Sequence, residues 1–301
     1  MSDPEIAALR ETIAKRVRSD DLAQRRRDID ARGLAYGVPA DITVEALDAN
    51  GVRSEWTVTP DADPSKAVLY LHGGGYVIGS LDSHRHLVAE VGRAARARAL
   101  AIDYRLAPEY PFPAAVDDAI AAYRFLLSGG VPPGGITLAG DSAGGGLVVA
   151  AMIAIRDAGL PQPACGWAIS PWVDMEATSD SMTSKAATDP IVQKAGIMDM
   201  AKLYLNGANP RSPLAAPIYA DLRGLAPLLI QVGAAETLLD DAVRLAQVAG
   251  SADVAVDLQV WPEMIHVWHI YHPELAAARR AIAAGGEFAK AMTSRGSRSG
   301  F

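Results

Sequence analysis

The stretch ITLAGDSAGGGLVV, residues 136–149, decides the fold. A short apolar run typical of a strand leads through a glycine-rich turn into a second apolar run with helical spacing. The turn follows the pattern G-x-S-x-G around Ser142. Small residues on both sides let strand and helix approach closely, so the serine occupies a sharp, strained turn and its hydroxyl points out of the sheet. This strand-then-helix context makes Ser142 a candidate nucleophile, although the five-residue pattern alone is a weak signal.

Apolar runs on either side of this stretch predict the rest of a sheet. Before residue 66, DITVEALDANGVRSEWTV (41–58) alternates polar and apolar residues around Asn50-Gly51, which predicts a β-hairpin. After it, continuous apolar runs alternate with amphipathic segments, as expected for strands covered by helices on both faces. We therefore expect an α/β fold with a mostly parallel sheet of about eight strands, flanked by helices. The further strands are expected at 66–72, 98–104, 165–170, 227–233 and 254–261, and helices near 82–95, 113–128, 143–158, 238–249 and 273–292.

Two segments do not fit this alternation. Residues 4–31 have helical spacing and predict two helices. Residues 173–224 contain no clear strand and are rich in Pro, Asn and Asp, with one helical stretch near 190–205. We interpret residues 173–224 as an insertion above the sheet that packs with the N-terminal helices as a lid. The expected organisation is N-terminal cap helices (1–40), a first core part (41–172), a cap insertion (173–224), a second core part (225–292) and a flexible tail (293–301).

Composition and charge argue against several classes of function. Half of the 301 residues are hydrophobic and the net charge is −7, so a large core is expected and nucleic acid or an anionic membrane is not an expected partner. The one basic cluster, Arg25–Arg27, lies among aspartates and is interpreted as a solvated helix face. The longest apolar run, residues 147–155, is too short to cross a bilayer, so we expect a cytoplasmic protein without stable membrane insertion. The single cysteine, Cys165, is expected to be a buried core thiol.

A second glycine-rich turn follows the strand expected at residues 66–72. In VLYLHGGGYVIGS (68–80), three consecutive glycines free the backbone to turn its N–H groups toward one point. Together with the amide of Ala143, such groups could hold a developing oxyanion. A flexible turn without chemistry is the alternative interpretation. A phosphate-binding loop fits less well, because no Lys-Ser/Thr pair follows the glycines.

A serine hydroxyl is a poor nucleophile without a base, and the chain has six histidines. His266 follows the last expected strand, at the end of the sheet where Ser142 is expected, and is the base we select. His269 and His272 follow at spacings of three, but no H-E-x-x-H motif or ligand partner supports a metal site. The remaining histidines are assigned to the glycine loop (His72) and to solvent-exposed or capping positions on a surface helix (His84 and His86).

The stretches HGGGYVIGS, DYRLAPEYPFPAAVDD and GDSAGGGL together resemble the hormone-sensitive-lipase-like esterases, the bacterial family IV carboxylesterases of the α/β-hydrolase fold. The resemblance extends from about residue 66 to 285. It implies an eight-stranded sheet, a helical cap built from the N-terminus and an insertion, and hydrolysis of short- to medium-chain acyl esters. It also implies that no metal or organic cofactor is needed, and a homodimer is a plausible assembly for such a protein.

The resemblance also assigns roles to individual residues. Its nucleophile corresponds to Ser142 and its base to His266, and its oxyanion donors correspond to Gly74, Gly75 and Ala143. The residues that complete the two motifs, and those that support the site from the YRLAPE stretch, are His72, Gly73, Gly140, Asp141, Gly144, Arg105 and Glu109.

The acid that would form a catalytic triad with Ser142 and His266 is less clear from the sequence. Many relatives have aspartate at the first position of a D-x-L-x-D-[DE] run, where this chain has Glu236 in ETLLDD (236–241). Thr237 and Asp240 match a capping box at the start of the next helix, which gives Asp240 a structural role. Glu236 lies at the end of a strand, 30 residues before His266, and has no such local role. We therefore predict Glu236 as the acid that orients His266, with Asp240 as the alternative.

These assignments predict a serine hydrolase that cleaves a small-molecule ester through an acyl-enzyme. One alternative is a non-catalytic ligand-binding protein on the same fold, as in the plant gibberellin receptors, which lack a complete triad. Another is an amidase, which the triad does not exclude. Candidate pocket residues are those that follow catalytic or strand-end positions, namely Tyr76, Trp172, Val267 and Trp268.

Overall fold

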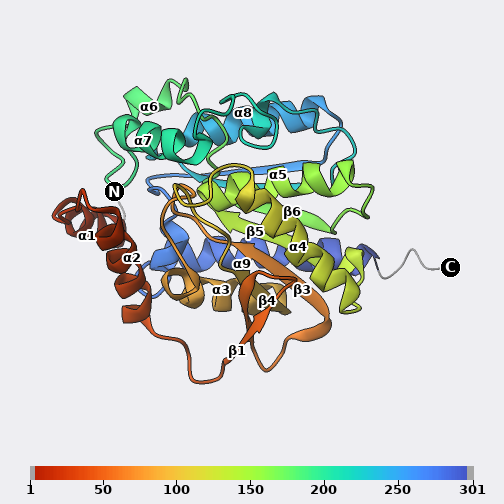
Figure 1. Cartoon of the computed structure of the whole chain (residues 1–301). Helices are drawn as coiled ribbons and strands as arrows, with labels where there is room; N and C mark the ends of the chain where they lie inside the picture. Colours follow the sequence, from red (N-terminus) through yellow and green to blue (C-terminus); the bar gives the residue numbers. More distant parts are fainter. Residues whose placement is uncertain (1–3, 297–301) are drawn as a thin grey trace.

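The computed structural model describes residues 4–296 and contains one eight-stranded sheet with helices on both faces (Figure 1). The strand order is β1-β2-β4-β3-β5-β6-β7-β8. Strands β1 and β2 are antiparallel to their neighbours and all other pairs are parallel, which confirms the predicted mostly parallel sheet. The strands are β1 (Thr43–Asp48), β2 (Arg53–Val58), β3 (Asp63–Leu71), β4 (Ala97–Ile102), β5 (Ile136–Asp141), β6 (Cys165–Ile169), β7 (Leu228–Gly233) and β8 (Val256–Trp261).

The two faces of the sheet are buried by different helices. Along β3, Leu69 and Leu71 belong to the apolar cluster that includes α4, α5 and α8, whereas Val68 and Tyr70 belong to the cluster that includes α3 and α9. Successive side chains of a strand point to opposite faces, so a strand covered on both sides must be apolar throughout. The helices are α1 (Pro4–Ala14), α2 (Leu22–Tyr36), α3 (Leu81–Ala95), α4 (Ala114–Ser128), α5 (Ala143–Asp157), α6 (Ser181–Ser184), α7 (Lys194–Leu205), α8 (Leu239–Ser251) and α9 (Ala276–Gly296).

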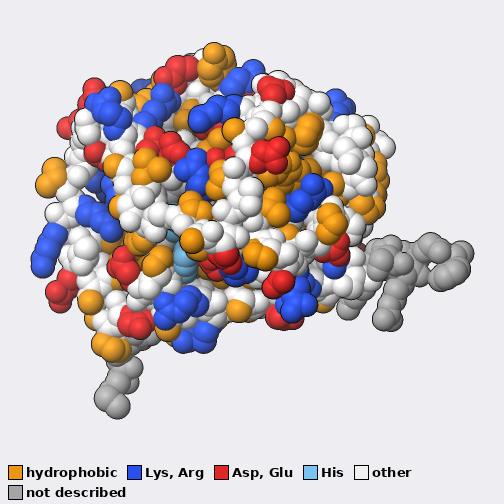
Figure 2. Space-filling view, turned by 90° about the horizontal axis from the view of Figure 1, so that it is seen from below, with side chains coloured by type: hydrophobic (Ala, Val, Ile, Leu, Met, Phe, Trp, Pro, Cys, Tyr) orange, Lys and Arg blue, Asp and Glu red, His pale blue; other side chains and the backbone are white. Residues whose placement is uncertain are grey.

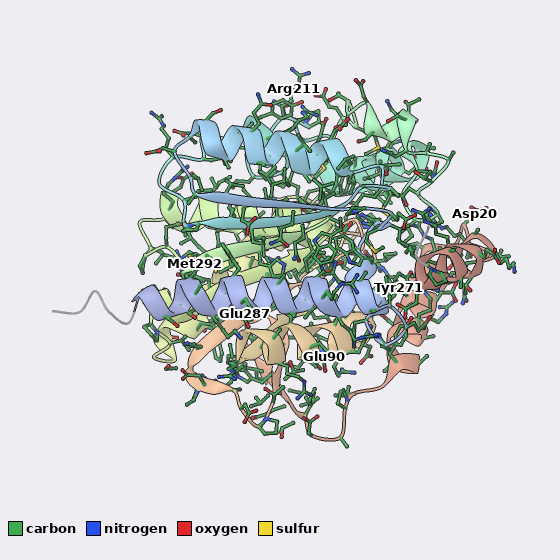
Figure 3. The ribbon with its side chains drawn as sticks, turned by 180° about the vertical axis from the view of Figure 1, so that it is seen from behind. Asp20, Glu90, Arg211, Tyr271, Glu287 and Met292 are labelled. Carbon is green, nitrogen blue, oxygen red and sulfur yellow. The ribbon has the colours of Figure 1, made fainter. Side chains whose placement is uncertain are left out.

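Helix α1 packs against the far end of the chain. Its buried residues Ile6, Leu9 and Ile13 share an apolar cluster with Trp268 and Tyr271. Figure 3 shows Tyr271 where α9 meets the N-terminal helices. The N-terminal segment is therefore attached to the body of the molecule beside the end of β8.

Helix α2 contradicts the interpretation of Arg25–Arg27 as a solvated face. The Arg26 guanidinium donates to the carbonyl oxygens of Val77 and Ala107, each at 2.9 Å, and pairs with Glu109 at 2.8 Å. Arg25 lines a cavity, and only Arg27 is exposed. The adjacent aspartates suggested that these side chains are solvated. The carbonyl groups that bind Arg26 lie 51 and 81 residues away in sequence, so the local pattern did not reveal them.

Three further observations concern the edges of the fold. Helix α9 extends to Gly296, so residues 293–296 are helical and not part of the predicted tail, while 297–301 lie outside the described residues. Of the helices between residues 4 and 296, none combines the length and the apolar character needed to cross a bilayer. Cys165 is buried, and burial raises the pKa of its thiol to about 12, so it is a core thiol as predicted.

Candidate active site

Ser142 lies in the turn between β5 and α5, and its backbone is strained. Its φ is 55° and its ψ is −120°, a conformation that non-glycine residues rarely adopt. A Cβ atom on Gly144 would collide with the carbonyl oxygen of Leu71 in β3, so this position must be glycine. The predicted strand, turn and helix are present at the predicted residues.

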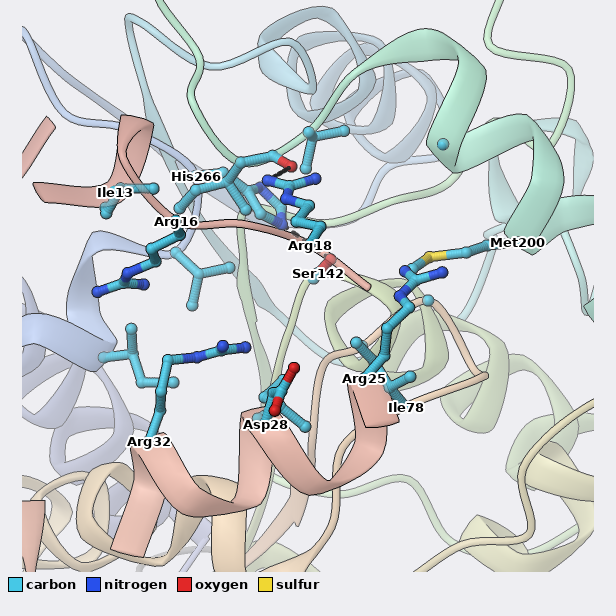
Figure 4. Close-up of a pocket in the computed structure, with 18 of the residues that line it drawn as sticks. Ile13, Arg16, Arg18, Arg25, Asp28, Arg32, Ile78, Ser142, Met200 and His266 are labelled. Carbon is cyan, nitrogen blue, oxygen red and sulfur yellow. Dashed lines mark hydrogen bonds between the residues drawn. The ribbon is translucent and has the colours of Figure 1, made fainter. Parts of the chain in front are cut away.

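The three predicted catalytic side chains lie together at the carboxyl ends of β5, β7 and β8. His266 Nε2 is 2.9 Å from Ser142 Oγ, and Figure 4 shows both residues at the cavity. His266 Nδ1 is 3.4 Å from Glu236 Oε1. Both His266 and Glu236 are buried. The arrangement gives the hydroxyl a neighbouring base and gives the base a neighbouring carboxylate.

Ser170, which the sequence analysis did not single out, holds this arrangement in place. Its hydroxyl donates to Glu236 Oε2 at 2.8 Å and accepts from the amide of Val267 at 3.1 Å. The amide of Gly233 also donates to Glu236 Oε2, at 3.0 Å. Ser170 follows the last residue of β6, so its place at the carboxyl end of a strand was the available signal.

Burial and charge act in opposite directions on His266. Burial lowers the pKa of its imidazole, but the hydrogen bond and the negative charge of Glu236 outweigh burial, so the pKa is raised. Burial also raises the pKa of the Glu236 carboxyl. An imidazole accepts a proton only when it is neutral, so the raised pKa sets the lower limit of the pH range in which His266 could serve as a base.

The predicted capping box at α8 is wrong. Leu238 occupies the N-cap position and no side chain caps the helix. The Thr237 hydroxyl donates instead to Asp189 Oδ2 at 3.1 Å, and Asp240 Oδ2 accepts from the amide of Ser181 at 2.8 Å. Both partners belong to the 173–224 insertion, so tertiary contacts replace the local pattern.

Asp240 and Asp241 are both oriented toward the insertion. Asp241 is buried and accepts from the amides of Val173 and Asp174, each at 3.0 Å. Glu236 is the carboxylate that faces His266, while these two aspartates bind backbone amides between residues 173 and 181. Glu236 therefore differs from Asp240 and Asp241 as predicted. The reason is that the two aspartates bind distant backbone amides, and not that they cap a helix.

The glycine loop after β3 presents backbone amides near the serine. Gly74 and Gly75 have φ values of 118° and 65°, which favour glycine. Within residues 4–296, no group accepts a hydrogen bond from either amide. Ala143 begins α5, so its amide has no partner within the helix. The amide of Gly73 is already used, since it donates to Asp141 Oδ1 at 3.1 Å.

A buried polar cluster supports this loop from below. Asp141 accepts from the Tyr70 hydroxyl at 2.8 Å and lies 3.4 Å from His84 Nε2. His72 Nδ1 is 2.7 Å from the carbonyl oxygen of Gly73, and burial lowers the pKa of His72 to about 3, so it is neutral. The prediction that His84 and His86 are solvent-exposed or capping residues is wrong, because both are buried and α3 is capped by Ser80 and Ser83. From the YRLAPE stretch, Arg105 pairs with Asp118 at 2.7 Å.

The histidines after His266 take separate partners. His269 Nε2 is 2.9 Å from Gln231 Oε1, and burial lowers the pKa of His269 to about 3. The His272 ring stacks on His86 with 5.4 Å between centroids. In the described part of the chain, no group of three His, Cys, Asp or Glu side chains is arranged to hold a metal ion.

A cavity of about 270 Å³ opens above Ser142 and His266. Of the four candidate pocket residues, Trp172 and Val267 line it. Tyr76 and Trp268 do not: Tyr76 is buried in a stack with Tyr204, at 3.8 Å between centroids, and Trp268 is buried in the cluster with α1. The other walls come from both segments outside the α/β alternation, residues 13–32 and 191–200.

Comparisons with known proteins found similar sequences and structures. Residues 68–270 match the family described as alpha/beta hydrolase fold. An acetyl-hydrolase of Streptomyces hygroscopicus is 47% identical over 98% of this chain and 99% of its own. Among solved structures, an esterase from the bacterial hormone-sensitive lipase (HSL) family has a TM-score of 0.95 and 48% identity, covering 97% of this chain and 99% of that one. The esterase EstE5, soaked by p-nitrophenyl butyrate, has a TM-score of 0.94 and 45% identity, covering 97% and 100%.

Proposed function

Since this chain belongs to the hormone-sensitive-lipase-like carboxylesterases of the α/β-hydrolase fold, we propose that it hydrolyses esters through an acyl-enzyme formed on Ser142. The observation that carries the proposal is the 2.9 Å contact between Ser142 Oγ and His266 Nε2, with Glu236 on the other ring nitrogen. Nucleophile, base and orienting acid are thus in the order that acyl transfer requires.

The proposed reaction has two steps. His266 takes the proton of Ser142 as Oγ attacks the ester carbonyl, and the resulting oxyanion is held by the amides of Gly74, Gly75 and Ala143. His266 then protonates the leaving alcohol. Water attacks the acyl-enzyme in the same way, with His266 again as base, and the carboxylic acid is released.

We further propose that the acyl group is short to medium in length. The Streptomyces relative is named for acetyl hydrolysis, and the EstE5 crystal was soaked with a butyrate ester. A cavity of about 270 Å³ suits small ligands better than long acyl chains. The N-terminal helices and the 173–224 insertion, which supply its outer walls, would act as the cap.

The test uses p-nitrophenyl esters of two to twelve carbons and a fluorophosphonate probe. We expect turnover to be highest for the short esters and the probe to label the wild type but not Ser142→Ala. The variant should retain its thermal transition and lose about 10³-fold or more in kcat. Hydrolysis by Ser142→Ala at the wild-type rate would overturn the proposal, and absence of both turnover and labelling in the wild type would favour a ligand-binding protein.

A further inference from the structure

Four arginines line the cavity above Ser142, and we propose that they select esters that carry an anionic group. Arg16 and Arg18 follow α1, and Arg25 and Arg32 belong to α2. The inference rests on the proposed function of Ser142 and adds the class of substrate: an ester whose acyl or alcohol part bears a carboxylate or a phosphoryl group. In Figure 4 these side chains surround the space in front of Ser142 and His266.

Within residues 4–296, none of the four arginines forms an ion pair with an acidic side chain, although the charges of Asp189 and Asp28 act on Arg18 and Arg32. Arg16 Nη1 donates to the Tyr271 hydroxyl at 3.2 Å, and Arg18 Nη2 donates to the carbonyl oxygen of Pro190 at 2.9 Å. Such neutral oxygens orient a guanidinium and leave its charge in place. The side chains of Arg25 and Arg32 form no ion pair or hydrogen bond with any part of the chain between residues 4 and 296.

The acidic side chains that line the cavity are fewer than the arginines. Asp28 Oδ1 accepts from Gln24 Nε2 at 2.7 Å, and the charge of Asp28 acts to raise the pKa of Arg32, so it offsets part of the positive charge. Asp141 is buried beneath the glycine loop. The cavity therefore carries an excess of positive charge in a chain whose net charge is −7. By contrast, the face in Figure 2 intersperses acidic and basic side chains.

Burial and the neighbouring cations act on two of the arginines in the same direction. Burial and then the nearby charge of Arg25 lower the pKa of Arg18, and burial and then the charge of Arg16 lower the pKa of Arg32. Like charges held together in a partly enclosed site repel one another, and an anion relieves that repulsion. A guanidinium also binds a carboxylate or phosphoryl group through two parallel hydrogen bonds. A neutral acyl chain would neither relieve the repulsion between the arginines nor accept their paired hydrogen bonds.

The first test compares matched neutral and anionic esters. The first pair tests an anion on the acyl side: p-nitrophenyl butyrate is neutral and p-nitrophenyl hydrogen succinate is anionic. The second pair tests an anion on the alcohol side: methyl 4-acetoxybenzoate is neutral and 4-acetoxybenzoate is anionic. We expect kcat/KM to favour the anionic member of at least one pair by about tenfold at low salt. That preference should shrink about threefold or more between 20 and 500 mM salt, because salt screens exposed charges. Equal kcat/KM within both pairs would overturn the proposal while leaving ester hydrolysis intact.

The second test assigns the preference to the arginines. Arg25→Gln and Arg32→Gln should each lower the ratio of anionic to neutral kcat/KM by about three- to tenfold. Arg27→Gln is the control: Arg27 is exposed on the same helix, donates to Gln24 Oε1 at 2.6 Å and does not line the cavity, so the ratio should not change. Equal ratios in all three variants would overturn the assignment.

A third measurement separates this inference from the proposed reaction. Calorimetric titration of Ser142→Ala with succinate and with butyramide needs no catalysis. Tighter binding of succinate, weakened by Arg25→Gln or Arg32→Gln, would support the anionic site even if Ser142 proved not to be the nucleophile. Equal affinity for the two ligands would overturn the site even if ester hydrolysis on Ser142 were established.

Discussion

Replacing Glu236 by glutamine removes the charge that faces His266 and keeps the size of the side chain. Glu236 uses both oxygens: Oε1 lies 3.4 Å from His266 Nδ1, and Oε2 accepts from Ser170 and Gly233. Glutamine has only one oxygen. If that oxygen keeps the bonds to Ser170 and Gly233, the amide N–H₂ group faces Nδ1, which must then be unprotonated. The proton moves to Nε2, the atom that must accept the proton of Ser142.

The expected loss in kcat is about 10³- to 10⁴-fold, the scale of the tautomer defect in serine proteases. That corresponds to about 4–5.5 kcal/mol of activation free energy. The pH profile should change as well. In the wild type, Glu236 raises the pKa of His266 against burial, and activity is lost as the pH falls through that pKa. Without the carboxylate, only the smaller effects of the Asp189 and Asp141 charges oppose burial, so the acid limb of kcat/KM should move to lower pH.

The assay is hydrolysis of p-nitrophenyl butyrate as a function of pH, with Asp240→Asn as the matched control. Asp240 accepts one hydrogen bond from the insertion and does not contact His266, so its variant should lose about 1 kcal/mol of unfolding free energy and keep its activity. The reasoning is refuted if Glu236→Gln stays within tenfold of wild type with an unmoved acid limb. A loss of about 10³-fold in Asp240→Asn would pass the role to Asp240.

Two further predictions concern residues that hold the site in shape. Gly75→Ala places a Cβ against Met200 Sδ at a φ of 65°, so the backbone that carries the Gly75 amide must shift. The value of kcat should fall about 10²-fold with the fold retained, and an unchanged kcat would show that the Gly75 amide is not an oxyanion donor. Ser170→Ala removes the hydroxyl that joins Glu236 to the amide of Val267. The free energy of unfolding in urea should fall by about 1–3 kcal/mol, and ester hydrolysis should slow about tenfold. A free energy of unfolding equal to that of the wild type would contradict this prediction.

The sheet and the serine were predictable because their causes are local. A strand buried on both faces, such as β5, must be apolar at every position, and the turn at Ser142 needs glycine where Leu71 approaches. Both constraints leave a pattern within a few residues. The position of His266 followed from the rule that reactive groups gather at the carboxyl ends of parallel strands.

The remaining features depend on contacts between distant segments. Thr237 and Asp240 have the sequence of a capping box, but Asp189 and Ser181 bind them from 48 and 59 residues away. His84 has the spacing of a surface helix residue, but it is buried beside Asp141 at the end of β5 and the ring of His72. Such partners have no local signature in the sequence.

The attachment of α1 has a consequence for the order in which the molecule folds. Arg10 donates to the carbonyl oxygen of Glu263, 253 residues further along the chain, and the other buried residues in the cluster of Ile6, Leu9 and Ile13 all follow β8. During synthesis α1 emerges early but has no surface to bind until most of the chain has left the ribosome. Contacts of such long sequence separation form slowly, because a long loop must close first. The outer wall of the cavity is therefore completed last, so esterase activity during refolding should recover after the sheet has formed.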